Sequence, residues 1–160
     1  MDHYLPMEEI ANQRLRVLVN AYTLFVKNLK DEGVDLEKVK AASDKAWAAI
    51  GVIAGQEFKE FYKDSPAKDA LFNSGSIVAE VHAMEVKEET GDTEKHVEIS
   101  KCPWNEAAEA FGMPEEWRLC RSGHEAFTAT MLQTITPEAR FEMPQSMTAG
   151  DAICEERISL

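Results

Sequence analysis

The hydrophobic pattern changes from a helical to an alternating period near residue 75, and this change limits the folds open to the chain. Before it, MEEIANQRLRVLVNAYTLFVKNLKDEG and LEKVKAASDKAWAAIGVIAGQEFKEFYK carry apolar residues at helical spacing. Pro6 can open the first predicted helix, Gly33 can close it and Asp35 can cap the second. A short third helix is predicted from Pro66 to about residue 73, with Gly75 as its stop.

Small residues gather in the middle of the second predicted helix. They permit close approach of backbones, which favours a tight helix–helix crossing over contact with a ligand. Long helices with small residues are also compatible with a homodimer. The residues are Ala48, Ala49, Gly51, Ala54 and Gly55.

After residue 75 the pattern is typical of strands. SIVAEVHAMEVKEE and EKHVEISK, joined by TGD, predict a β-hairpin. The second strand has a polar face with His96, Glu98 and Ser100, and an apolar face with Val97 and Ile99. The same alternation places Cys102 on the polar face, and Glu80 and His82 share one face of the first strand.

Two further helices and two further strands follow. CPWNEAAEAFG predicts a short helix, and Pro114 begins a longer one that runs to about residue 134. ARFEMPQSMTAGDAICEERISL reads as two strands joined at Gly150-Asp151, with Pro144 at an edge or bulge. The expected fold is α+β, with N-terminal helices on an antiparallel sheet in the order ααα-ββ-αα-ββ. We expect one domain over 1–160, with a helical part at 1–75 and the sheet and site-bearing helices at 76–160.

The charge balance excludes several kinds of partner. The 160 residues carry a formal net charge of −12 at pH 7, and no basic stripe is present. Such a surface repels nucleic acids and anionic membranes. No apolar run is long enough to span a bilayer, and MDHYLPMEEI has acidic residues where a secretory signal has basic ones. We therefore expect a cytoplasmic protein, whose three cysteines remain available as thiols.

The three cysteines and one histidine suggest a site. Cys102 lies at the predicted N-cap of a helix, where free amides and the helix dipole would lower the pKa of its thiol. Cys120 and His124 are four residues apart, so a continuous helix places them on one face. Cys154 follows a turn that could return it to the same pocket. Together the four residues could hold zinc or iron, although their spacing matches no zinc-finger pattern. The alternative is that all four are ordinary core residues.

Three segments, CPWNEAAEAFGMPEEW, LCRSGHEAF and TPEARFEMPQSMTAGDAICEERI, resemble the L-2-amino-thiazoline-4-carboxylic acid hydrolase family. The matching positions are Cys102, Cys120, Gly150 and Cys154. The resemblance implies addition of water to the C=N carbon of a cyclic isothiourea, which gives S-carbamoyl-cysteine. It also implies an α+β ligand-binding domain similar to the vinyl reductase-like, TRAPP and haem–nitric-oxide-binding group. Family members often carry an Asp three residues after the second cysteine, where this chain has Gly123.

Two functions are therefore open. The first is a hydrolase acting on a C=N or C–N bond of a small amino-acid-like ring, with Cys102 as nucleophile or the cysteines holding a metal ion. His124 would be the general base, oriented by Glu98 or His96. A carboxylate on the substrate would be anchored by Arg118, Arg121 or Arg140. The second is a non-catalytic domain that binds a small molecule or a metal, and its apolar cavity would use Met131, Met143 and Met147.

Overall fold

The computed structural model describes residues 6–160, so residues 1–5 of the stretch used to argue against a secretory signal lie outside it. Within this part of the chain the helices are α1 Met7–Asp31, α2 Leu36–Phe61, α3 Ala67–Val81, α4 Pro103–Ala110 and α5 Cys120–Ile135, with short 3₁₀ helices η1 Glu115–Trp117 and η2 Met147–Ala149. The strands are β1 Glu85–Thr90, β2 Glu94–Lys101, β3 Arg140–Gln145 and β4 Cys154–Ser159. The predicted α+β class and element order are confirmed.

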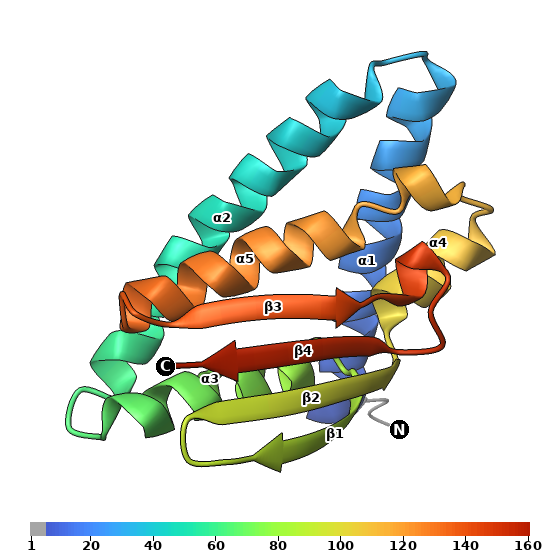
Figure 1. The fold of residues 1–160 in the computed structure, drawn as a ribbon. Helices are drawn as coiled ribbons and strands as arrows, with labels where there is room; N and C mark the ends of the chain where they lie inside the picture. Colours follow the sequence, from blue (N-terminus) through green and yellow to red (C-terminus); the bar gives the residue numbers. More distant parts are fainter. Residues whose placement is uncertain (1–5) are drawn as a thin grey trace.

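The four strands form one antiparallel sheet in the order β1-β2-β4-β3, and the helices cover one of its faces (Figure 1). Helix α5 runs beside β3, and α2 packs on the far side of α5 (Figure 1). The pairing of β3 with β4 skips a residue near Pro144, so Pro144 lies in a bulge of an edge strand, as predicted. None of the helices in the described residues is long and apolar enough to cross a membrane.

The helix ends follow the predicted local chemistry. Gly33 has φ +74°, the left-handed conformation that ends α1, and Gly112 has φ +64° after α4. The Asp35 carboxylate accepts a hydrogen bond of 3.1 Å from the backbone N–H of Lys38, which caps α2.

The prediction that Gly75 stops the third helix was wrong, because α3 continues to Val81. Gly75 lies inside the helix, where an added Cβ would be 2.8 Å from the Ile158 side chain, so the glycine lets α3 approach the sheet. The predicted strand SIVAEVHAMEVKEE is thus helical in its first part. The chain turns at Ala83, with φ +49°, before β1 begins at Glu85. Glu80 and His82 therefore lie at the end of a helix and not on a strand.

The predicted continuous helix from Pro114 is also interrupted. The 3₁₀ turn η1 ends at Trp117, and α5 begins only at Cys120. Leu119, which lies in the break between these two helices, is buried in a cluster with Val26 and Val39.

The predicted tight crossing is formed by α2 and α5. Gly51 lies against the Phe127 carbonyl, and a Cβ at Gly55 would be 2.6 Å from the carbonyl oxygen of Met131. No larger residue fits at either position without moving a backbone. This contact fixes α5, and with it Cys120 and His124, relative to the long helices.

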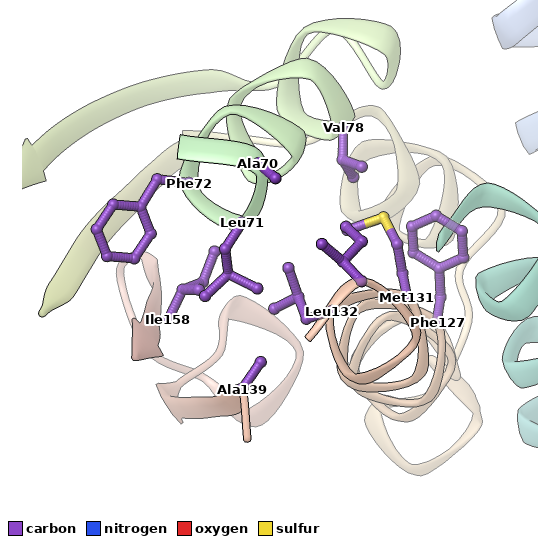
Figure 2. Packing of buried hydrophobic residues seen from close by; sticks show 10 residues of the cluster. Ala70, Leu71, Phe72, Val78, Phe127, Met131, Leu132, Ala139 and Ile158 are labelled. Carbon is purple, nitrogen blue, oxygen red and sulfur yellow. The ribbon is translucent and has the colours of Figure 1, made fainter. Parts of the chain in front are cut away.

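Side chains from α3, α5 and β4 meet in the main core (Figure 2). Leu71 of α3 and Ile158 of β4 point toward one another, while Met131 and Leu132 enter from α5 (Figure 2). These four side chains have no measurable exposure to solvent. The core holds α3 and α5 on the same face of the sheet.

A buried lysine ties α3 to the β1–β2 hairpin. The Lys95 side chain is 2% exposed, and its ammonium contacts the Phe72 carbonyl at 3.0 Å, the Ser76 hydroxyl and the Glu88 carboxylate at 2.9 Å. All three donor positions of the ammonium are used, so the charge is compensated. Helix α3 is therefore tied, through Phe72 and Ser76, to the hairpin that follows it.

Candidate functional site

A single cavity of about 50 Å³ brings together four of the six predicted site residues. Cys102, Cys120, His124 and Cys154 all line it, although they come from two elements, α5 and β4, and from the link between β2 and α4. All three cysteines are free thiols. The four residues that the sequence pattern grouped thus share one cavity.

The register of β2 and β4 explains which residues of the sheet reach this cavity. Ile99 lies opposite Cys154 and Val97 lies opposite Glu156, and directly opposed residues share a face. This face is covered by the helices, so Cys154 and Glu156 point into the protein. Glu156 was not among the residues predicted for the site.

Cys102 reaches the same cavity because of a β-bulge. Val86 of β1 pairs with Ile99 of β2, and the neighbouring Glu85 pairs with Lys101. Ser100 has no partner on β1 and is therefore the extra residue of the bulge. The bulge shifts the alternation by one residue, and Cys102 becomes buried next to Val97 and Ile99. The predicted place of Cys102 on the polar face was therefore wrong.

His96 and Glu98 lie on the opposite, solvent-exposed face of the sheet. The His96 imidazole is 3.0 Å from the Glu94 carboxylate, and Glu98 is 3.7 Å from the Lys87 ammonium. Both line a separate surface depression with Glu155. They do not contact His124, so neither orients it.

Glu156 takes the position that was expected for Glu98 or His96. The His124 Nε2 atom is 2.7 Å from the Glu156 carboxylate and 3.3 Å from the Thr128 hydroxyl. The two side chains of the ion pair are only 16% and 9% exposed. Burial alone would lower the pKa of His124, but the charge of Glu156 and the hydrogen bond to it raise that pKa above its ordinary value. His124 is thus stabilised as a cation, and its Nδ1 remains for a ligand.

A second histidine in the cavity has its pKa shifted in the opposite direction. The indole N–H of Trp104 donates a hydrogen bond of 2.9 Å to His82 Nδ1, so the neutral ring of His82 carries its proton on Nε2. Burial, reinforced by the charge of His124, lowers the pKa of His82 to about 4. At neutral pH His82 is therefore a neutral N–H donor.

The predicted low pKa of the Cys102 thiol was wrong. Backbone N–H groups of Asn105 and Trp104 do favour its thiolate, but burial outweighs them and raises the pKa to about 11. Burial also raises the pKa of Cys120 to about 12 and that of Cys154 above its usual value. All three thiols are therefore protonated at neutral pH.

The predicted metal ligands share a cavity but not a coordination geometry. Across residues 6–160, no group of three or more His, Cys, Asp or Glu side chains is arranged to hold a metal ion. The predicted zinc or iron site at Cys102, Cys120, His124 and Cys154 therefore has no support from the side-chain positions.

Aromatic rings form the wall opposite the sheet. Tyr22, Trp47 and Trp104 pack edge to face, with ring centroids 5.4 to 6.0 Å apart. The Tyr22 hydroxyl is held 2.6 Å from the Ser43 hydroxyl. Together with Phe127, these rings suit a flat, apolar ligand surface.

Gly123 is explained by this aromatic wall. A Cβ at this position would lie 2.6 Å from Trp47 Cδ1, so the indole occupies the space that a side chain on α5 would need. A larger residue would not fit here unless Trp47 moved. The indole of Trp47 thus presents an apolar surface at this point of the wall.

One of the three arginines expected to anchor a carboxylate lines the cavity. Arg121 donates to the Met143 carbonyl at 3.0 Å and pairs with Glu125 at 3.2 Å, with its side chain 39% exposed. Arg118 lies elsewhere, against the Met113 carbonyl and Glu109, and Arg140 is exposed on β3. Arg121 is therefore the cation of this set that a ligand in the cavity could reach.

The fold is shared with solved structures of low sequence identity. A trafficking protein particle complex subunit 3 from Naegleria fowleri, covalently bound to palmitic acid, superposes with a TM-score of 0.63 at 16% identity, covering 93% of this chain and 96% of the other. The phenol-responsive sensory domain of the transcription activator PoxR, solved with phenol, gives 0.64 at 12% identity, covering 88% and 73%. No curated protein matches the sequence. The model of the L-2-amino-thiazoline-4-carboxylic acid hydrolase family matches residues 13–158, and the chain belongs to that family.

Proposed function

We propose that this protein is a hydrolase that adds water to the C=N carbon of a small cyclic amino-acid-like substrate, of the L-2-amino-thiazoline-4-carboxylate type. The observation that carries the proposal is the buried pair of His124 and Glu156, 2.7 Å apart on the wall of the cavity. A histidine oriented by a carboxylate is a common device for moving protons in hydrolysis. Membership of the family supports the same chemistry.

His124 is the proton-transfer residue in this proposal, and Glu156 is its positioning residue. Because Nε2 bonds to Glu156, Nδ1 exchanges protons with the substrate. In the first step the C–O bond forms, the π electrons of C=N move to nitrogen, and nitrogen takes the Nδ1 proton of His124. The attacking water then gives one of its protons to the vacated Nδ1, so His124 is protonated again. In the second step the C–N bond breaks with its electron pair on nitrogen, and the hydroxyl proton is transferred to that nitrogen through His124. One water is consumed and no electrons are exchanged.

The thiols have a different role from the one first expected. Protonated Cys102, Cys120 and Cys154 are weak nucleophiles, because the thiolate is the attacking form. In the proposed reaction they line the cavity as small, polarisable groups, and water is the nucleophile.

The size of the cavity and a few polar groups on its mainly apolar wall support a small ring-shaped substrate. A volume of about 50 Å³ accommodates a few waters or a small ring. Arg121 provides a cation for a substrate carboxylate, and His82 provides a fixed N–H donor. The rings of Trp47 and Trp104 cover the apolar face of a heterocycle.

A second candidate is a domain that binds a small ring-shaped ligand without chemistry. Three observations favour it: the protonated thiols, the aromatic wall at Trp47 and Trp104, and the fold shared with a sensory domain solved with phenol. In this case His82 and His124 would hydrogen-bond an acceptor atom of the ligand and no bond would break.

The two candidates are separated by product analysis. The purified protein is incubated with L-2-amino-thiazoline-4-carboxylate, and S-carbamoyl-cysteine is followed by liquid chromatography and mass spectrometry. The hydrolase proposal expects His124→Gln to reduce the rate by about 100-fold or more. Glu155→Gln, on the outer face of β4 next to Glu156, is the control and keeps the wild-type rate. Binding seen by NMR without any product would favour the second candidate.

A further inference from the structure

Helix α1 exposes an apolar stripe that nothing in the described part of the chain covers. Val17 is 69% exposed, Leu18 57% and Phe25 59%, with Leu24 at 40%. These positions repeat at seven-residue intervals, so they lie along one side of the helix. The buried residues of α1, among them Val19, lie on its other side.

Helix α2 has a similar exposed stripe. Ile50 is 48% exposed and Ile53 57%, and they are continued along the helix by exposed alanines at positions 42, 46 and 49. Gly51 and Gly55, which face α5, lie on the opposite side of α2. Both stripes therefore face away from the body of the protein, on the two long helices that meet at the loop after α1 (Figure 1).

The two stripes are free of charge in a strongly acidic chain. Residues 17–25 and 46–56 contain no Asp, Glu, Lys or Arg, whereas the whole chain has a formal net charge of −12. A surface without charge does not steer a charged partner or a lipid headgroup, and it lets two copies of an acidic protein approach each other.

We propose that the exposed stripes of α1 and α2 form the interface with a second copy of this chain. The six large side chains, Val17, Leu18, Leu24, Phe25, Ile50 and Ile53, expose roughly 600 Å² in total, against about 800 Å² per partner in a standard interface. The neighbouring alanines and a polar rim supply the rest.

A second copy is the occupant that the composition favours. A two-fold axis brings the same patch of each protomer together, so an apolar surface meets an apolar surface without a matching set of charges. The interface lies on the far side of α2 from α5, so the proposal is independent of the function of the cavity.

The test is sedimentation equilibrium of the full chain at micromolar concentrations. The wild type is expected at twice the chain mass, and Leu18→Glu or Ile53→Glu is expected to raise the dissociation constant by about 30-fold or more. Val81→Glu is the matched control, because Val81 is 65% exposed but lies on α3. It should leave the dimer intact.

Circular dichroism checks that each variant is folded, and Leu18→Gln serves if the charged variant is not. A monomeric wild type would overturn the proposal, and so would a dimer that both substitutions leave at wild-type affinity. A monomer that co-sediments with phosphatidylcholine vesicles would overturn it in favour of a membrane surface.

Discussion

Acidification should destabilise this protein through His82. In the folded state its pKa is lowered to about 4, because the ring is largely buried beside Trp104 and close to the charge of His124. In the unfolded chain the same ring has an ordinary pKa of about 6.5. Between these values the unfolded state binds a proton that the folded state does not, so stability falls as the pH falls. A pKa difference of about 2.5, at about 1.4 kcal/mol per tenfold change, corresponds to about 3.5 kcal/mol in full. About 3 kcal/mol of this is lost between pH 7 and pH 4, because the folded ring is itself half protonated at pH 4.

The assay is urea unfolding of wild type and His82→Gln at several pH values across this window. A glutamine amide does not titrate, and its carbonyl can still accept the hydrogen bond from the Trp104 indole. The variant should therefore lose less stability than the wild type on acidification, by about 3 kcal/mol. Parallel curves for the two proteins would refute the reasoning, because they would show that His82 titrates alike in both states.

Three further predictions concern the cavity. Glu156→Gln removes the charge that opposes burial, so the pKa of His124 should fall below its ordinary value in an NMR titration; an unchanged value would mean that the ion pair is not formed. The three thiols should react slowly with a disulfide reagent at neutral pH and rapidly after unfolding, whereas a fast-reacting Cys102 in the folded protein would contradict its raised pKa. Gly123→Asp should lower the free energy of unfolding by about 1–3 kcal/mol, because its Cβ meets Trp47; equal stability to Ser122→Ala would show that the indole moves freely.

The order of elements could be predicted because its signals are local. Asp35 as a cap, Gly33 and Gly112 as helix ends, and the turn between the strands each depend on a few adjacent residues. The α3 helix was misjudged because β-branched residues favour strands locally, while contact with Ile158 and the other core residues stabilises the helix. Tertiary packing decides whether such a segment forms a helix or a strand. A single sequence does not show which residues will pack together.

The candidate site was predicted only in part, because some of its features are local and others depend on strand register. The places of Cys102, Cys120, His124 and Cys154 at the edges and faces of elements suggested a shared pocket, with ordinary core residues as the alternative, and the structure brings all four to one cavity. The bulge at Ser100 and the pairing of β2 with β4 depend on register, so the sequence could not tell that Glu156 faces the cavity while Glu98 faces solvent. The alternation from Cys154 to Glu156 was the available signal, because it places both on one face.

Hydrolysis in water labelled with ¹⁸O tests the central claim most directly. The wild-type protein is incubated with L-2-amino-thiazoline-4-carboxylate, and the product is analysed by mass spectrometry beside the His124→Gln variant. We predict S-carbamoyl-cysteine that carries one labelled oxygen in its carbamoyl group, formed by the wild type at a rate that His124→Gln reduces by about 100-fold. Unchanged substrate across the pH range in which the protein is folded, or labelled product formed equally well by the variant, would contradict it.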